Sequence, residues 1–173
     1  MIQAQRISSS YHRHHYPAYT TRYSQYLLPA FRTLDAQDAP KRPKVYGGII
    51  SVNHEDQEKV RYALVFGRYS NKWSFPKGHA NDDEAPMECT KREILEETGI
   101  HTLPDPIDYI RVGYGNYYVF CLNKAIPLHT RDAGEISDTK WCTIAEMEQM
   151  AVNIDVSRYM KDWKRRNRVE PQP

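Results

Sequence analysis

Three glutamates, Glu93, Glu96 and Glu97, lie within a run of five residues directly after Arg92. On a helix, which turns by about 100° per residue, these three carboxylates fall within one narrow arc. Like charges at such spacing repel one another, and the negative end of a helix dipole adds to the repulsion. Mg²⁺ reverses this balance, because it takes oxygen ligands and is shared between protein carboxylates and substrate phosphates. The alternative is a solvated acidic helix face.

A helix must carry these glutamates, and its ends can be predicted. Pro86 suits the first turn of a helix and Gly99 suits the position after its end, so we predict a helix from about Ala85 to Thr98. Met87 and Ile94 lie together on an adjacent arc of this helix. We expect that arc to be the buried side.

The rest of the chain supplies strands on both sides of this helix and further helices after them. Apolar, β-branched segments predict strands at 44–52, 61–67, 106–113, 117–123 and 139–143. Thr143 and Glu146 form a T-x-x-E capping box, which predicts a helix over 144–151. A terminal helix should place one side on the core, through Val156, Tyr159, Met160 and Trp163. These elements indicate a layered α+β domain.

The chain has 173 residues and is 40% hydrophobic, which is enough for one sizeable core. We therefore predict one domain over 44–173 that ends in a basic C-terminal helix, preceded by a basic, tyrosine-rich and partly ordered extension over 1–43. Interleaved arginine and tyrosine could bind RNA through its backbone and bases. The alternative is a tail whose tyrosines cover the domain.

The three cysteines, Cys89, Cys121 and Cys142, are scattered and lack CxxC spacing, so neither a disulfide framework nor a zinc site is expected. This usage fits a reducing compartment. No apolar run approaches the roughly 18 residues of a membrane span, and the first residues contain no apolar segment typical of a signal peptide. We expect a cytoplasmic or nuclear protein that is not secreted and has no membrane partner.

The spacing around the glutamates extends over a longer motif. Gly78, five residues, Glu84, seven residues and then the run from Arg92 to Ile100 agree at every fixed position with GX5EX7REUXEEXGU. The chain here resembles the Nudix hydrolases, whose box has this form. The resemblance implies the Nudix fold, a mixed β-sheet packed between helices as an α/β/α sandwich. It leaves the first 43 residues outside.

The resemblance also implies a role for each matching residue. Nudix hydrolases bind Mg²⁺ or Mn²⁺ through the box, and water attacks a phosphorus of a diphosphate linked to another group. The implied roles are Glu96 and Glu97 as primary metal ligands, Glu93 as ligand or general base, Arg92 as the arginine that orients Glu93, Glu84 as an outer or second-metal carboxylate, and the backbone carbonyl of Lys77 as a further ligand. Such metals neutralise phosphoryl charge and lower the pKa of bound water.

Residues outside the box are expected to complete the site. Many members of the family use a glutamate from the loop facing the helix, and Glu135 matches it as a metal ligand or base; a plain loop surface is the alternative. The P-K-G run that ends at Gly78 resembles members that act on dinucleoside polyphosphates and on the mRNA cap. Expected substrate contacts are Lys77, Arg68, Lys72 and Tyr117, the last by stacking on a base.

These observations leave three functions open. The first is hydrolysis of a pyrophosphate bond in a nucleoside diphosphate-linked substrate, with capped RNA or a dinucleoside polyphosphate favoured. The second is an inositol pyrophosphate phosphohydrolase, whose dense small anion the same basic residues would grip. The third is a catalytically silent module that binds nucleotide or RNA, but its loss of catalysis would usually show as a missing glutamate, and none is missing from the box.

Overall fold

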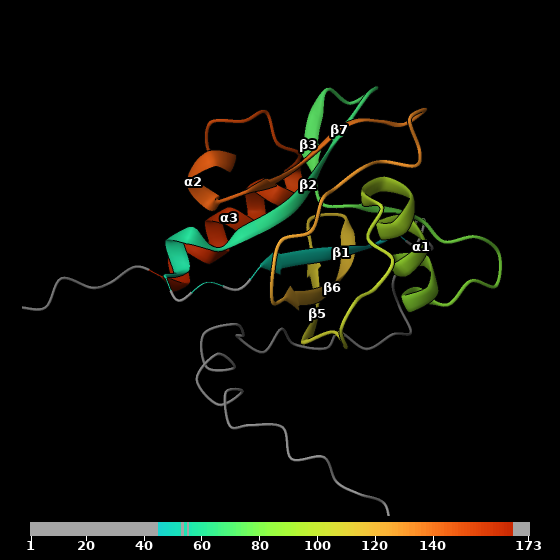
Figure 1. Cartoon of the computed structure of the whole chain (residues 1–173), viewed down its shortest axis with the longest axis horizontal. Coiled ribbons are helices and arrows are strands. Elements are labelled where there is room, and N and C mark those ends of the chain that lie inside the picture. Colours follow the sequence, from blue (N-terminus) through green and yellow to red (C-terminus); the bar gives the residue numbers. More distant parts are fainter. Residues whose placement is uncertain (1–44, 53, 55, 168–173) are drawn as a thin grey trace, which may run out of the picture. The chain divides into compact units, whose positions relative to one another are not determined.

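The computed structural model describes residues 45–52, 54 and 56–167. The predicted extension over 1–43 and the last residues of the basic tail lie outside this range. In chain order the elements are β1 (Val45–Val52), the short 3-10 helix η1 (Gln57–Lys59), β2 (Arg61–Gly67), β3 (Lys72–Ser74), β4 (Lys77–His79), α1 (Pro86–Thr98), β5 (Asp108–Val112), β6 (Gly115–Leu122), β7 (Ile136–Cys142), α2 (Ile144–Met147) and α3 (Ile154–Arg166) (Figure 1). Among the described residues, no helix combines the length and apolar character needed to cross a membrane.

The strands form one mixed sheet with the order β3-β2-β1-β6-β5, in which β4 pairs with β1 and β7 pairs with β2. β1 and β6 run parallel, and the other strand pairs are antiparallel. β1 meets β4 at its beginning and β2 at its end, through Ser51 and Val52. β4, which precedes α1 in the chain, therefore lies beside β1, and α1 contacts both strands.

Helices cover both faces of the sheet (Figure 1). On one face, α3 contributes Val156, Tyr159 and Trp163 to a buried cluster with strand residues such as Ile49 and Leu64. On the other face, Ile94 of α1 packs with Ile50, Ala63 and Phe120. This arrangement confirms the α/β/α sandwich, because alternate residues of each strand enter opposite layers.

The C-terminal helices match the prediction in part. On α3, Val156, Tyr159 and Trp163 are buried as expected, and Met160 is partly buried. The capping box at Thr143 is formed, since its hydroxyl accepts the Glu146 N–H at 3.2 Å. The helix after it was predicted too long, because it ends at Met147.

The cause of this early end lies in the chain that follows. The Ala151 carbonyl accepts the Trp73 N–H at 2.8 Å, and Val152 forms a parallel bridge with Trp73. Pairing with β3 replaces the helical hydrogen bonds that a longer α2 would need.

Candidate functional site

α1 is fixed to the sheet by its apolar side, which turns its acidic side towards β4 and the loop that precedes the helix. Ile94 is fully buried against β1, where a Cβ on Gly48 would overlap the Ile94 side chain. Met87, predicted to share this buried side, is only partly buried. The helix begins at Pro86, and Gly99 ends it with φ 75°, a left-handed conformation that glycine adopts without strain. These bounds agree with the predicted helix.

Arg92 lies at the centre of the acidic cluster. Its Nε and Nη2 donate to the two carboxylate oxygens of Glu84 at 2.8 and 2.9 Å. Its Nη1 donates to Glu93 Oε1 at 2.7 Å and to Glu96 Oε2 at 3.1 Å, and Nη2 also donates to the His79 carbonyl at 3.0 Å. The planar guanidinium thus holds three carboxylates and the loop before the helix in one arrangement. The predicted contact between Arg92 and Glu93 is present. Arg92 also makes two hydrogen bonds to Glu84, which were not predicted.

Two of the three carboxylates that share Arg92, those of Glu84 and Glu93, have pKa values shifted in opposite directions. Hydrogen bonds from Arg92 and from the Asn81 N–H lower the pKa of Glu84 to about 2. Burial raises the pKa of Glu93, and its hydrogen bond from Arg92 opposes that rise. A Cβ on Gly78 would overlap the Glu93 carboxylate, so a larger residue here would displace that carboxylate from its present position. The Glu93 carboxylate therefore lies close against the backbone at Gly78, whereas Glu84 stays ionised at neutral pH.

Glu97 is the most buried carboxylate of the cluster. It is 7% exposed and accepts the Lys77 N–H at 2.9 Å. Burial raises its pKa to about 8, and repulsion from Glu93 and Glu135 adds to the rise. A buried acid with so little compensation gains stability from any cation that reaches it.

Glu135 comes from the loop before β7 and lies near the helix glutamates. Its negative charge contributes to the raised pKa of both Glu93 and Glu97. Two hydrogen bonds tie the loop to the end of α1, because the N–H groups of Arg131 and Asp132 donate to the Glu96 carbonyl at 2.7 and 3.1 Å. The structure therefore brings the predicted loop glutamate to the box.

Asp132 is a residue that the sequence prediction missed. Its Oδ1 accepts the N–H groups of Gly134 and Glu135 at 3.0 and 3.1 Å, which shapes the backbone just before the glutamate. The signal was present, because an Asp two residues before a Gly is typical of an Asx turn.

The three basic residues predicted to contact the substrate, Arg68, Lys72 and Lys77, differ in their exposure and in their contacts. Arg68 lies against the Glu135 loop, because its N–H donates to the Glu135 carbonyl at 2.7 Å and its Nη2 donates to the Ala133 carbonyl at 3.0 Å. Lys72 is exposed at the start of β3 and pairs with Gly67 across the same hairpin. Lys77 is half-buried, and its positive charge acts on the carboxylate that its backbone binds.

Tyr117, predicted to stack on a substrate base, lies in the core. Its side chain is fully buried, with its ring centroid 5.7 Å from that of Phe75 and its hydroxyl donating to Asp155 at 2.5 Å. A ring enclosed in this way offers no face to a base, so Tyr117 is a structural residue. The prediction failed because neighbouring strand residues point to opposite faces, and the buried partner, Asp155, is far along the chain.

The residue types of the cluster fit a hard divalent cation. Its possible ligands are carboxylate and carbonyl oxygens, the donors that Mg²⁺ and Mn²⁺ prefer. Within 45–52, 54 and 56–167, no group of three or more His, Cys, Asp or Glu side chains is close enough together to hold a metal ion. Three carboxylates instead face the guanidinium of Arg92. The fit rests on the donor chemistry and on Glu97, a buried acid whose carboxylate has one backbone hydrogen bond and no ion pair among the described residues.

Comparison with known sequences gives both a family and relatives. A family model described as NUDIX domain matches residues 45–163. An RNA pyrophosphohydrolase of Bartonella bacilliformis is 31% identical over 75 residues, which cover 40% of this chain and 43% of the relative. An mRNA-decapping enzyme subunit 2 of Arabidopsis thaliana is 43% identical over 58 residues, which cover 34% of this chain and 14% of the relative. The chain spans less than half the length of each of these relatives.

Solved structures agree on the fold. The crystal structure of a C. elegans Ap4A hydrolase binary complex aligns with a TM-score of 0.55 at 20% identity, over 70% of this chain and 96% of that chain. A likeness at this level of identity concerns the arrangement of helices and strands. It agrees with the sandwich built from β1 to β7, α1 and α3.

Proposed function

The chain belongs to the NUDIX domain family, and from this premise we propose that it hydrolyses a pyrophosphate bond of a nucleoside diphosphate-linked substrate with the help of Mg²⁺ or Mn²⁺. The observation that carries the proposal is the cluster of Glu93, Glu97 and Glu135, in which Glu97 is buried, Glu93 is partly buried and all three carboxylates repel one another. A fold gains nothing from such a group by itself. A cation and a polyphosphate would make it favourable.

Each residue of the cluster has a place in this proposal. Glu96 and Glu97, with the carbonyl of Lys77, would hold the metal, which supplies charge for the phosphoryl oxygens and a more acidic bound water. Glu93 accepts the proton of the attacking water, because burial raises its pKa towards the working pH and Arg92 fixes its carboxylate. Glu135 adds negative charge from the facing loop.

The surroundings support a substrate with several phosphates. Arg68, Lys72 and Lys77 place positive charge on the hairpin and strand next to the carboxylates, where phosphates remote from the attacked bond would lie. The names of the two sequence relatives favour RNA with a 5′-terminal pyrophosphate linkage, such as a cap. The P-K-G run keeps dinucleoside polyphosphates as the other favoured substrate.

The alternative substrate, an inositol pyrophosphate, would bind through the same three basic residues, Arg68, Lys72 and Lys77. Such a compact anion needs positive charge around it and has no base for the protein to contact. The basic last turn of α3 supports neither substrate strongly. Arg165 pairs with Asp162 at 3.1 Å, and Lys164 pairs with Glu148. Part of the positive charge that suggested RNA is thus neutralised by neighbouring carboxylates.

We also propose that the protein works in a reducing compartment such as the cytoplasm. Cys89, Cys121 and Cys142 are free thiols. Burial raises the pKa of Cys89 and of Cys142 to about 11, so both stay protonated and unreactive. Fractionation of cells that express the tagged chain would test this location.

A substrate panel tests the proposed activity. Capped RNA, triphosphorylated RNA, a dinucleoside tetraphosphate, a nucleoside triphosphate and an inositol pyrophosphate are each incubated with Mg²⁺ or Mn²⁺, and kcat/KM is compared between the wild type and Glu97→Gln. We expect the highest value for a capped RNA or the dinucleoside tetraphosphate, and loss of turnover in the variant. Preference for the inositol compound would select the alternative, and no turnover of any substrate would favour a silent binding module.

A further inference from the structure

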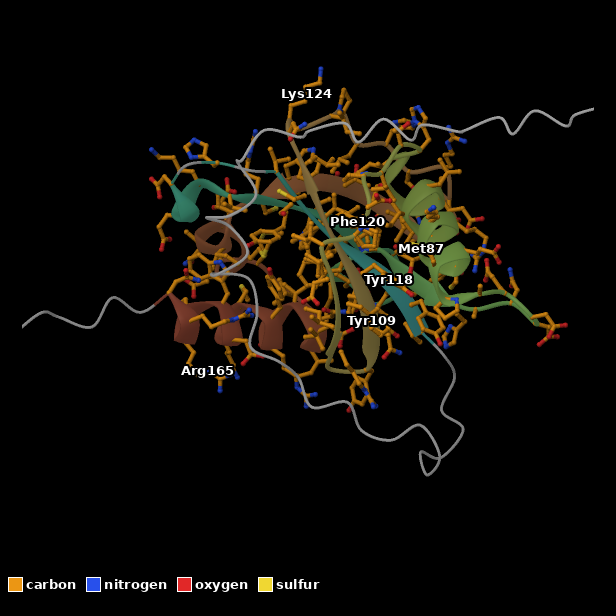
Figure 2. The ribbon with its side chains drawn as sticks, turned by 90° about the horizontal axis from the view of Figure 1, so that it is seen from below. Met87, Tyr109, Tyr118, Phe120, Lys124 and Arg165 are labelled. Carbon is orange, nitrogen blue, oxygen red and sulfur yellow. The ribbon has the colours of Figure 1, made fainter. Side chains whose placement is uncertain are left out.

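Two tyrosines form an exposed aromatic surface away from the carboxylates. Tyr109 on β5 and Tyr118 on β6 lie directly opposite each other, with ring centroids 4.6 Å apart and an angle of 48° between the rings. Tyr109 is 49% exposed, and Tyr118 is partly buried. Figure 2 labels both, close together over the strands. Because about half of its surface is exposed, the side chain of Tyr109 contributes little to the hydrophobic core.

The position of these rings follows from strand alternation. Ile110 and Val112 of β5 enter the core on the α3 side, so Tyr109 and Arg111 project on the α1 side. Tyr118 packs on the α1-side cluster. β5 is the last strand of the sheet on this side, so the surface lies at an edge and is open to a long ligand. We call Tyr109, Tyr118 and Arg111 the tyrosine face.

The tyrosine face carries positive charge. The α1-side positions of β5 and β6 that are exposed or partly buried hold one arginine, one asparagine and two tyrosines, and no carboxylate. The charge of Arg111 acts on the hydroxyl of Tyr109. Paired rings beside a cation suit the bases and the backbone of a single strand.

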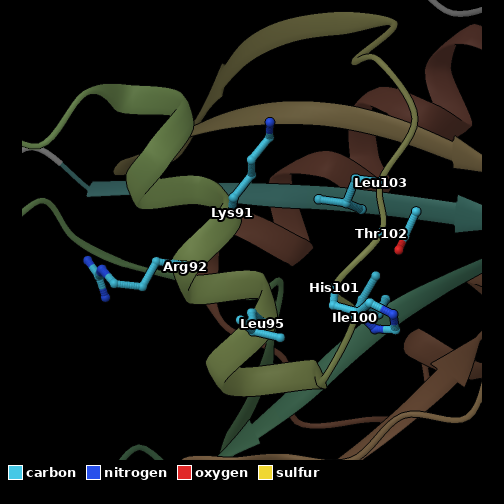
Figure 3. Close-up of a pocket in the computed structure, with 7 residues that line it drawn as sticks. All are labelled: Lys91, Arg92, Leu95, Ile100, His101, Thr102 and Leu103. Carbon is cyan, nitrogen blue, oxygen red and sulfur yellow. The ribbon is translucent and has the colours of Figure 1, made fainter.

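A cleft lies on the same side of the sheet, between α1 and the chain that follows it. It has a volume of about 350 Å³, and Lys91, Leu95, His101 and Leu103 are among the residues that line it. Leu103 and Tyr118 pack against the same buried cluster. Figure 3 shows that the side chains of Lys91 and Arg92, which both line the cleft, extend in different directions from α1, with Lys91 over the strands. α1 therefore directs Arg92 towards the carboxylates and Lys91 over the strands.

We propose that the tyrosine face binds the bases of single-stranded RNA that follow the hydrolysed linkage, with Lys91 contacting the backbone. This inference rests on the proposed function and narrows its substrate to RNA. Stacking on a ring accepts any base, so the surface would add affinity without sequence preference. It would distinguish an RNA from a dinucleoside polyphosphate, which has no chain beyond its second nucleoside.

Fluorescence anisotropy with a short single-stranded RNA that carries a 5′-hydroxyl and a 3′-fluorophore tests the proposal on the full chain. We expect Tyr109→Ala to raise the Kd about tenfold, equal to about 1.4 kcal/mol, whereas Tyr109→Phe keeps the ring and stays within about twofold. Arg111→Gln should lower the slope of log Kd against log salt by about 0.7. An unchanged Kd in Tyr109→Ala together with an unchanged slope in Arg111→Gln overturns the proposal.

The control is Tyr114→Ala, which removes a tyrosine that is 65% exposed and has Arg158 6.0 Å from its ring centroid. Like Tyr109, Tyr114 is an exposed tyrosine near an arginine, but no second aromatic ring is paired with it among the described contacts. We expect the Kd of Tyr114→Ala for the RNA to equal that of the wild type. An equal loss in this variant would overturn the assignment to the tyrosine face.

Turnover separates this proposal from the catalytic one. Tyr109→Ala should hydrolyse a dinucleoside tetraphosphate at the wild-type rate, and Glu97→Gln should bind the RNA normally without hydrolysing any substrate. A change of molar mass in Tyr109→Ala without a change in RNA affinity would assign the face to a second copy of the chain and overturn the RNA proposal.

Discussion

Replacing Glu97 by glutamine should stabilise the metal-free protein while removing its activity. Glutamine has nearly the shape of glutamate, and its side-chain carbonyl can still accept the Lys77 N–H that now binds the carboxylate. What the substitution removes is a buried acid, 7% exposed, whose negative charge is opposed by burial and by neighbouring carboxylates.

The size of the effect depends on pH. The pKa of Glu97 is raised from 4.5 to about 8, so the folded protein keeps this proton in a range where the unfolded chain has lost it. Between these two pH values the folded state binds more protons, and its stability falls as pH rises. The full shift corresponds to about 5 kcal/mol above pH 8. Because the neighbouring acids titrate together with Glu97, we expect about half of this to be realised.

Thermal unfolding in EDTA at pH 5 and pH 8 measures the difference. Glu97→Gln should raise the Tm at pH 8 by about 10 °C, since each kcal/mol is worth about 4 °C in a domain of this size, and by less than about 3 °C at pH 5. Glu88→Gln is the matched control. It changes an exposed glutamate of the same helix and keeps an acceptor for the Ala85 N–H, so its Tm should follow the wild type.

The same experiment with Mg²⁺ adds a second readout. A cation bound beside Glu97 stabilises the wild type at pH 8 and has a smaller effect on Glu97→Gln. If Glu97→Gln gained no stability over the wild type at pH 8, or gained as much at pH 5, the reasoning about a buried and poorly compensated acid would be refuted.

Three further substitutions test other parts of the site. Arg92→Lys should lower kcat by about tenfold to a hundredfold in the turnover assay, because a lysine cannot hold Glu84 by two parallel hydrogen bonds; a wild-type kcat would contradict this. Gly78→Ala should lower kcat at least as much, since its Cβ would displace the Glu93 carboxylate, and a rate equal to the wild type would show that this close approach is unimportant. Tyr117→Phe should cost about 1–3 kcal/mol in urea unfolding, because it leaves a buried carboxylate without its hydroxyl partner, while KM stays unchanged; a raised KM with wild-type stability would restore its predicted contact with the substrate.

Much of the fold could be read from local signals. The helix that carries the box was predicted within one residue of its observed start, because Pro86 and Gly99 mark its two ends by their own backbone preferences. Five of the seven described strands followed from runs of β-branched and aromatic residues, whereas the three-residue strands β3 and β4 were not predicted. α2 was predicted too long, since the pairing of Trp73 with Val152 is a contact between distant segments that no local pattern shows.

For the candidate site too, local features could be predicted from the sequence and contacts between distant residues could not. The helical arc of Glu93 and Glu97 follows from spacing alone, and so could be predicted. The two-bond contact between Arg92 and Glu84 spans eight positions and depends on how the loop before α1 folds back. Tyr117 and Tyr118 are neighbours on opposite faces of β6, and only the folded chain shows that Tyr117 is the one enclosed.

Dependence of turnover on Mg²⁺, measured side by side for the wild type and Glu97→Gln with the best substrate of the panel, tests the central claim most directly. We predict that the wild type shows no turnover in EDTA, that its rate rises to saturation with added Mg²⁺, and that the variant stays at least about a hundredfold slower at saturation. Turnover by the wild type that persists in EDTA, or equal rates for the two proteins at saturating Mg²⁺, would contradict it.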